Sequence, residues 1–411
     1  MLDKTKTDWH EAATALTIDG RAFLGGDYCD SLSGETRSTV NPATGKPLAD
    51  VAVCGAEDAE LAVKNARAAF ESGVWASMAP ADRKMVLVRW AELIDEHAEE
   101  LALLESLDVG KPIGDTLYGD VPAASRTIRW SGEAIDKIYD EIAPTPEGTL
   151  ALVQRLPLGV VAAIVPWNFP LSTTAWKLAP SLATGNSVIL KPATNTPLSA
   201  LRIAGLASEA GLPDGVLQVL PGPGGSLGKH LSTHMDIDGL TFTGSTEIGK
   251  LLMEYSGQSN LKRTFLELGG KSPNIVFADG NLDKAAAYAA TAVFYNGGQT
   301  CTAGTRLIVE EKVRDEFIEK VVASAAKWMP GDPLDPATRM GPMIDEWQYK
   351  TVAEYVDIGK GEGAELLFGG GRVLEELGGH FHEPSIFGGV NNEMRIAQEE
   401  IFGPVTALIR V

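Results

Sequence analysis

The sequence is poor in cysteine, in basic residues and in long hydrophobic runs. It has 3 cysteines in 411 residues and no CxxC pair, so neither a disulfide framework nor a cysteine-based zinc site is expected. Lysine and arginine number 35 against 55 aspartates and glutamates, and this net charge of −20 argues against nucleic-acid and acidic-membrane partners. No run approaches the ~18 apolar residues of a membrane helix, and the N-terminus lacks the pattern of a signal peptide. We therefore expect a cytoplasmic protein.

A dinucleotide fingerprint is also missing, because neither GxGxxG nor GxxxxGK[ST] follows an expected strand. What is present is an apolar content of 44% with 22% charged residues, enough to form two or three buried cores. From residue 159 onward, short apolar runs alternate with expected helices, at residues 172–183, 197–210, 224–233 and 245–256. This alternation predicts βαβ units and an α/β fold with helices on both faces of a parallel sheet.

The flanking regions have different patterns. The sequence predicts short strands over residues 20–55, and helices from Pro80 to about Leu107 and over 120–140. A proline-punctuated extended stretch then predicts a projecting hairpin. RTFLEL and PNIVFA begin a second α/β block with helices near 282–296 and 312–328. The sequence stops inside the strand-like run PVTALIRV, so we expect a second block that is incomplete at its C-terminus.

Cys301 is the first candidate for chemistry, because it lies among glycines and small polar residues in NGGQTCTAG. Backbone N–H groups around such a cysteine can favour a thiolate and hold an oxyanion. A buried packing cysteine is the alternative reading.

Glu267 and Asn168 follow expected strands, where α/β sheets place their ligands. Glu267, in LELGGKS, can act as a general base, or it can cap a turn or pair with Lys271. Asn168, in VPWNFP, can donate its amide N–H to an oxyanion, or the segment can be an aromatic–proline corner. Lys191 and Ser245 also end strands and can contact ribose or phosphate.

Two histidine pairs, His230 with His234 and His380 with His382, have the spacing of possible metal ligands. No third ligand lies near either pair in the sequence, so surface histidines are the preferred reading and no metal site is predicted.

Taken in order, PWNFP, KPA, FTGSTEIG, LELGGKS, GGQTCTAG and EEIFGPV resemble the aldehyde dehydrogenase superfamily, from about residue 20 to the end. The N-terminal segment and RTIRWSGEAIDKIYDEI are most similar to its aminoaldehyde branch, which includes γ-glutamyl-γ-aminobutyraldehyde dehydrogenase. The resemblance implies NAD(P)-dependent oxidation of an aldehyde to a carboxylate, with Cys301 as nucleophile, Glu267 as general base and Asn168 as oxyanion donor. The intermediates are a hemithioacetal and then a thioester.

For the cofactor, NAD with NADP possible, the resemblance implies contacts from Pro166, Trp167, Lys191, Thr194, Gly244, Ser245, Gly269, Glu399 and Phe402. Thr194 replaces a glutamate that many NAD-preferring relatives carry, which leaves NADP use open. For the substrate tunnel it implies Asp120, Ala123, Phe169, Ser172, Trp176, Thr300 and Thr302. Asp120 is a candidate partner for a substrate ammonium group, with helix capping as the alternative.

The resemblance also implies an aldehyde dehydrogenase-like domain plan. A Rossmann-like nucleotide-binding domain comprises residues 1–137 and 158–266, a projecting oligomerisation segment comprises 138–157, and an α/β catalytic domain comprises 267–411. The implied partners are a small aldehyde and further copies of the chain, as a homo-dimer or homo-tetramer. Two other readings stay open, namely a non-catalytic or incomplete relative and a thiol esterase without redox chemistry.

Overall fold

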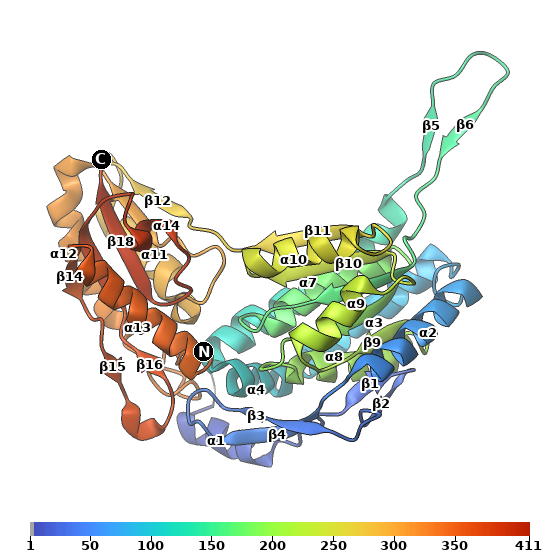
Figure 1. The fold of residues 1–411 in the computed structure, drawn as a ribbon, viewed down its shortest axis with the longest axis horizontal. Helices are drawn as coiled ribbons and strands as arrows, with labels where there is room; N and C mark the ends of the chain where they lie inside the picture. Colours follow the sequence, from blue (N-terminus) through green and yellow to red (C-terminus); the bar gives the residue numbers. More distant parts are fainter. Residues whose placement is uncertain (1–3) are drawn as a thin grey trace.

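The computed structural model describes residues 4–411, which form two open sheets with helices on both faces and a long hairpin that projects from one end (Figure 1). The two sheets lie toward opposite ends of the molecule, and the segment between β11 and β12 connects them (Figure 1). None of the helices in these residues is both long and apolar enough to span a membrane.

The first sheet has seven strands in the order β11-β10-β7-β8-β9-β1-β2. Its five parallel strands are β7 (Val160–Ile164), β8 (Ser187–Lys191), β9 (Leu217–Val219), β10 (Gly239–Gly244) and β11 (Arg263–Leu268). Two antiparallel strands, β1 (Ala22–Leu24) and β2 (Asp27–Cys29), extend the sheet beyond β9. Strands β7 and β8 are buried throughout, which explains their unbroken apolar sequences.

Successive residues of β7 enter the cores on opposite faces of this sheet, as the two-residue repeat of a strand requires. Ala163 packs in the core under one helical layer, and Ala162 and Ile164 pack in the other. The first layer comprises α3 (Pro80–Glu96), α4 (Ala98–Val109), α6 (Val121–Ala134), α7 (Pro170–Ala183) and α8 (Leu198–Glu209). The opposite layer comprises α2 (Ala56–Ser72), α9 (Lys229–Thr233) and α10 (Thr246–Gly257).

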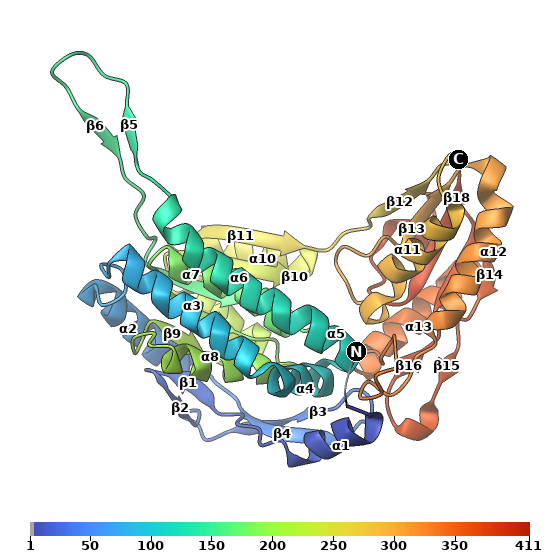
Figure 2. The same cartoon turned by 180° about the vertical axis from the view of Figure 1, so that it is seen from behind.

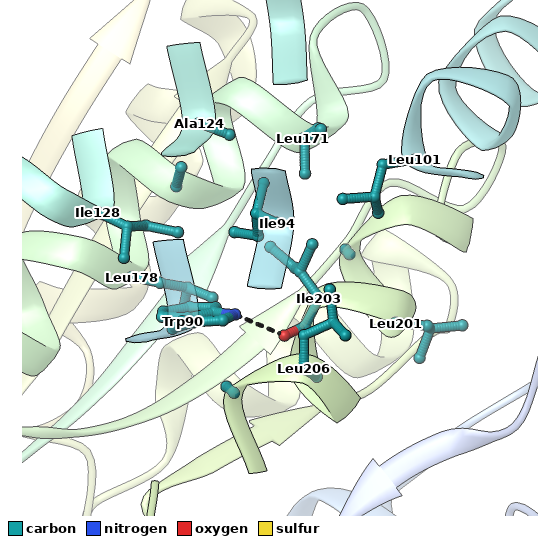
Figure 3. Close-up of a cluster of buried hydrophobic side chains, with 14 of the residues drawn as sticks. Trp90, Ile94, Leu101, Ala124, Ile128, Leu171, Leu178, Leu201, Ile203 and Leu206 are labelled. Atoms are coloured by element: carbon teal, nitrogen blue, oxygen red, sulfur yellow. Dashed lines mark hydrogen bonds between the residues drawn. The ribbon is translucent and has the colours of Figure 1, made fainter. Parts of the chain in front are cut away.

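The core of the first layer includes an anchored tryptophan on α3. Trp90 is 1% exposed, and its indole N–H donates to the backbone oxygen of Ile203 on α8 at 2.9 Å (Figure 3). Ile94 and Leu178 lie beside it (Figure 3). A buried tryptophan with a satisfied N–H contributes a large apolar contact without an unpaired polar atom.

The second sheet has five strands in the order β12-β13-β18-β17-β14. They are β12 (Pro273–Val276), β13 (Arg306–Val309), β18 (Val405–Arg410), β17 (Ser385–Val390) and the antiparallel β14 (Glu365–Phe368). One face packs on α11 (Leu282–Phe294) and α12 (Arg314–Ala325), and the other on α13 (Glu346–Gly361) and α14 (Arg395–Gln398).

The predicted hairpin is present as β5 (Glu141–Ala143) and β6 (Ala151–Val153), which pair antiparallel. It extends away from the helical layers (Figure 2), and its apolar side chains are exposed, with Ile142 at 72% and Leu152 at 59%. Smaller elements are α1 (Lys6–Ala15) and two short strand pairs, β3 (Thr36–Val40) with β4 (Pro47–Ala52) and β15 (Arg372–Val373) with β16 (Phe381–His382).

Three expectations need correction. The helix predicted from Pro80 to Leu107 is broken at His97, whose ψ of 24° redirects the chain. α3 keeps an exposed side, whereas α4 is buried from Leu101 to Val109. One straight helix cannot satisfy both environments. The helix expected over 120–140 ends at Ala134. RTFLEL belongs to the first sheet, because β11 pairs with β10 and not with β12. The domain boundary at residue 267 stays a prediction.

Candidate active site

A cavity of about 710 Å³ lies at the carboxyl ends of β7, β10 and β11. This is the edge at which open α/β sheets bind ligands. The loop after α11, the first turns of α13 and the segment before β18 complete the wall. The lining residues are Gly119, Asp120, Ala123, Pro166, Trp167, Asn168, Phe169, Ser172, Thr173, Trp176, Thr243, Gly244, Ser245, Glu267, Leu268, Gly269, Tyr295, Thr300, Cys301, Thr302, Trp347, Gln348, Thr351, Glu400, Ile401 and Phe402.

Cys301 reaches the cavity on a tight turn after α11. Asn296, Gly297 and Gly298 have φ values of 51°, 63° and 71°, and glycine adopts this left-handed region without strain. A Cβ on Gly298 would lie 2.1 Å from the backbone oxygen of Gly403, so only glycine fits there. The turn therefore brings the cysteine loop against the segment before β18.

Asn168 joins the turn after β7 to the cysteine loop. Its Nδ2 donates to the backbone oxygen of Gln299 at 2.8 Å, and Asn296 Nδ2 donates to the backbone oxygen of Asn168 at 3.0 Å. Asn168 is 3% exposed. The bond to Gln299 uses one of the two amide N–H groups, so a second N–H remains to serve a group in the cavity.

The Cys301 thiol is half-buried, and its pKa lies above the ordinary value. Burial is the largest cause, and the Glu267 and Glu400 carboxylates add to it because negative neighbours disfavour a thiolate. The backbone N–H groups of Cys301 and Thr302 act in the opposite direction. The thiolate stabilisation expected from the N–H groups is thus outweighed by burial and the two carboxylates.

Glu267 is the penultimate residue of β11, and it is exposed at the cavity. The burial expected of a general base is therefore absent. The alternative pairing with Lys271 is not among the ion pairs of residues 4–411. Gly269, two residues further on, lies against the Glu400 carboxylate, since a Cβ there would lie 1.8 Å from Glu400 Oε2 and would displace that side chain.

Six of the nine expected cofactor residues line the cavity: Pro166, Trp167, Gly244, Ser245, Gly269 and Phe402. The rings of Trp167 and Phe402 meet edge to face at 5.3 Å. Ser245 caps the N-terminus of α10 by accepting the N–H of Ile248 at 3.3 Å, and the free N–H groups of such a terminus attract anions.

Lys191 and Thr194 lie outside the cavity lining but next to each other. Lys191 Nζ donates to the backbone oxygens of Pro192 and Gly222, at 2.8 and 3.0 Å, and Thr194 Oγ1 donates to the same Gly222 oxygen at 3.2 Å. Burial lowers the pKa of Lys191 to about 8. The two side chains, which lie at and just after the end of β8, therefore share the Gly222 oxygen as their acceptor.

Glu399, expected to contact the cofactor, is not among the residues that line the cavity. Its carboxylate pairs with Arg395 at 2.9 Å and accepts the Tyr355 hydroxyl at 2.7 Å, and these bonds, with Arg395 first, lower its pKa. The next residue, Glu400, lines the cavity instead. Burial raises the pKa of Glu400. Of the two glutamates, Glu400 is therefore the one that can contact a ligand in the cavity.

All seven expected tunnel residues line the cavity. Asp120, however, is buried and engaged: Lys111 Nζ lies 2.7 Å from its Oδ2, and the Ser172 hydroxyl donates to Oδ1 at 3.3 Å. Lys111 also lies 3.5 Å from the centroid of the Phe169 ring. The capping alternative is wrong, because the Asp120 side chain makes no cap hydrogen bond to α6.

Several lining residues were not predicted: Gly119, Thr173, Thr243, Leu268, Tyr295, Trp347, Gln348, Thr351, Glu400 and Ile401. Glu400 and Ile401 belong to the EEIFGPV motif and could have been found there. Trp347 and Gln348 begin α13 and carry no recognisable pattern. Gln348 Nε2 donates to the backbone oxygen of Phe402 at 2.7 Å, a contact between segments that are distant in sequence.

A cysteine-centred cavity between two doubly wound sheets defines the class as an α/β enzyme of the covalent type. The chain belongs to the aldehyde dehydrogenase family, whose sequence model it matches over residues 28–411. The predicted resemblance is confirmed. The chain is 51% identical over 403 residues to "NADP/NAD-dependent aldehyde dehydrogenase PuuC" of Escherichia coli K12, covering 98% of this chain and 81% of that protein.

Two solved structures are also similar to this chain, with the same TM-score. The Pseudomonas syringae indole-3-acetaldehyde dehydrogenase AldA, solved as a cysteine-to-alanine mutant in complex with NAD+ and IAA, has a TM-score of 0.98 and 55% identity, covering 99% of this chain and 83% of that one. The γ-glutamyl-γ-aminobutyraldehyde dehydrogenase of Burkholderia cenocepacia J2315 has a TM-score of 0.98 and 52% identity, covering 99% and 82%. The likeness extends to the aminoaldehyde branch.

Proposed function

We propose that the chain oxidises an aldehyde to the carboxylate with NAD or NADP, through a covalent adduct on Cys301. The single observation that carries this proposal is the cavity, because it collects a thiol, a carboxylate and a spare amide N–H from three distant segments at the ends of the parallel strands. The comparisons support the reaction class, since PuuC is named as NADP/NAD-dependent and AldA binds NAD+.

The cavity suits a dinucleotide along β10 and β11. The Thr243 hydroxyl is buried beside Gly244 and Ser245 and has no hydrogen-bond partner among residues 4–411, and the α10 N-terminus follows directly. We assign the pyrophosphate to Ser245 and the α10 N–H groups, the adenosine ribose to Lys191, and the nicotinamide ribose to Glu400. When bound, NAD or NADP supplies the hydride acceptor.

In the first chemical step, the Cys301 thiol gives its proton to solvent water, the sulfur attacks the aldehyde carbon, and the carbonyl oxygen becomes an oxyanion. The second N–H of Asn168 and the backbone N–H of Cys301 stabilise that charge. Because Asn168 is buried and tied to Gln299, its donor is held in place before the substrate arrives. Transfer of the hydride from the adduct to NAD or NADP would leave a thioester on Cys301.

Glu267 then activates water to hydrolyse the thioester. Two observations support this role: the carboxylate is near enough to raise the pKa of the Cys301 thiol, and it is open to solvent, which supplies the water. The product is a free carboxylate and a regenerated thiol.

For the substrate, we propose an aldehyde whose chain carries an amine or amide, such as γ-glutamyl-γ-aminobutyraldehyde. Relatives named as aminoacetaldehyde and γ-glutamyl-γ-aminobutyraldehyde dehydrogenases support this class. The tunnel wall combines the aromatic side chains of Phe169, Trp176 and Tyr295 with Asp120, which pairs with Lys111 outside the lining. Since Lys111 already balances the charge of Asp120, we do not assign the ammonium contact to Asp120 alone.

We further propose a cytoplasmic location and assembly as a homo-dimer or homo-tetramer. The three cysteines are all free, as in a reducing compartment. The β5–β6 hairpin exposes Ile142 and Leu152, and exposed apolar side chains of this kind mark interaction surfaces. Size-exclusion chromatography with light scattering tests the assembly: a monomer at micromolar concentration contradicts it.

The reaction is tested by mixing the purified chain with an aminoaldehyde and NAD or NADP, and by following both NAD(P)H and the carboxylate. A thiol esterase without redox chemistry would hydrolyse an activated ester but reduce no cofactor, and a non-catalytic relative would do neither. Cofactor reduction that requires Cys301 supports the dehydrogenase.

A further inference from the structure

His230 and His234 meet a third possible metal ligand that the sequence does not place near them. Glu60 lies on α2, His230 on α9 and His234 just after α9. His230 Nε2 lies 2.8 Å from Glu60 Oε1, and His234 Nε2 lies 3.3 Å from Glu60 Oε2. Within residues 4–411, this is the one group of three such side chains whose ligand atoms all fall within 4.8 Å of one another.

From this geometry we propose that Glu60, His230 and His234 form a binding site for a divalent transition-metal ion of the zinc class. Two imidazoles and one carboxylate are a ligand set that such ions prefer. The four-residue spacing of the histidines places both rings on one side of the turn, with their centroids 5.8 Å apart. Each ring presents Nε2 to a different oxygen of the same carboxylate, so the three ligand groups lie together on one side of the turn.

The surroundings leave room for water ligands and favour a cation. Side-chain exposure is 60% for Glu60, 29% for His230 and 11% for His234. The site is thus open on the Glu60 side, where solvent can complete the coordination. The chain carries a net charge of −20, and no Lys or Arg of residues 4–411 forms an ion pair with Glu60.

The metal-free state is held by hydrogen bonds that the metal would replace. The backbone N–H of Asp236 donates to His234 Nδ1 at 3.0 Å, so the ring proton lies on Nε2 and points at Glu60. Coordination through Nε2 moves this proton to Nδ1, so one metal–nitrogen bond replaces two hydrogen bonds, from Nε2 to Glu60 and from the Asp236 N–H to Nδ1.

Binding would connect two elements of the same helical layer. α2 and α9 belong to one core through Ala62 and Leu231, and a shared ion adds a link at their exposed ends. Because a metal that binds only the folded state stabilises it by mass action, the ion should raise the thermal unfolding midpoint.

The test is a calorimetric titration of Zn²⁺ into the full chain, with Glu60→Gln, His230→Ala and His234→Ala as ligand variants. His10→Gln is the matched control, because His10 pairs with Asp332 at 2.8 Å in a cluster that lacks a second histidine. Circular dichroism checks that each variant is folded, which is expected because the positions lie at the surface.

We expect one saturable Zn²⁺ site per chain in the wild type and the control. We expect at least about tenfold weaker binding in each ligand variant, since losing even an outer partner of a metal ligand costs that much. Co²⁺ should give the visible bands of nitrogen and oxygen ligation, without a thiolate charge-transfer band. Ligand variants that titrate like the wild type would place the metal elsewhere, for example on a thiol. If Zn²⁺ shows no saturable binding, the three side chains only hydrogen-bond to one another. Either of these two results overturns the proposal.

Discussion

Asn168 Nδ2 donates to the backbone oxygen of Gln299 at 2.8 Å, joining segments 131 residues apart. This bond fixes the turn after β7 against the loop that presents Cys301. One polar side chain therefore positions the cysteine loop and keeps a second amide N–H for the proposed oxyanion role. In the proposed mechanism, the oxyanion donor and the nucleophile are built as one unit.

The first prediction concerns this amide. We expect Asn168→Ala to lower kcat by about 10²- to 10³-fold, the usual effect of removing one oxyanion donor, and KM to change much less. Steady-state kinetics measure the effect. The alkylation rate of Cys301 reports whether the loop is still in place, and an unchanged kcat would exclude the oxyanion role.

The second prediction concerns the pH dependence of the thiol. Because burial and the Glu267 and Glu400 carboxylates raise the pKa of Cys301, alkylation by iodoacetamide in the cofactor-free protein should increase through the alkaline range. Glu267→Gln removes one negative neighbour, so its rate profile should shift to lower pH. A shift to higher pH, or none, would show that Glu267 does not act on the thiol.

Glu267→Gln also tests deacylation. If Glu267 activates the hydrolytic water, the variant should form the thioester but release it slowly. We expect a burst of NAD(P)H close to one per chain, followed by a steady rate lower by about 10²- to 10⁴-fold. Rapid-mixing measurements show this directly. A variant with a slow first turnover and no burst contradicts the assignment.

The third prediction concerns Lys111 and Asp120, whose side chains are only 1% and 4% exposed. Removing one partner of a buried ion pair leaves an uncompensated charge, so Lys111→Met should reduce the free energy of unfolding by about 3–5 kcal/mol. The double variant Lys111→Met, Asp120→Leu should recover much of this loss. Denaturant unfolding measures both.

Lys350→Met is the matched control for that experiment, because Lys350 pairs with Glu346 at 2.8 Å at the surface. We expect no measurable change in unfolding there, since exposed pairs contribute little. A Lys111→Met variant as stable as the control would show that the buried pair is not required for stability.

The fourth prediction concerns cofactor choice. Thr194 lies beside Lys191 at the end of β8 through their shared Gly222 acceptor, and a carboxylate there should repel a 2′-phosphate. We expect Thr194→Glu to lower the ratio of kcat/KM for NADP to that for NAD by about tenfold or more, equivalent to about 1.4 kcal/mol. Thr194→Val, which adds no charge, is the control. An equal ratio in Thr194→Glu and Thr194→Val would show that this position does not select the cofactor.

The sequence predicts those parts of the site that sit on regular elements. Asn168 and Ser245 follow strands whose apolar runs are unmistakable, and the structure places both at one edge of the first sheet. Glu267 joins them because β11 pairs with β10, whereas the sequence predicts RTFLEL in the second block. The ends of β7, β10 and β11 must meet because these strands are parallel neighbours.

What could not be predicted depends on contacts between distant segments. The choice between Glu399 and Glu400 depends on Arg395 and Tyr355, which hold Glu399 away from the cavity. The raised pKa of Cys301 reflects its burial first and then carboxylates from two other segments. Similarly, Glu60 is 170 residues from His230, so no local pattern could reveal their cluster.

The most direct test of the proposed reaction is NAD(P)H formation, measured by its near-ultraviolet absorbance, when the folded 411-residue chain is mixed with an aminoaldehyde and each cofactor, with Cys301→Ala alongside. We expect cofactor reduction that matches carboxylate formation one for one and is abolished in Cys301→Ala. Cofactor reduction that continues in Cys301→Ala would contradict the proposed reaction. So would the absence of cofactor reduction in a wild-type chain that is shown to be folded.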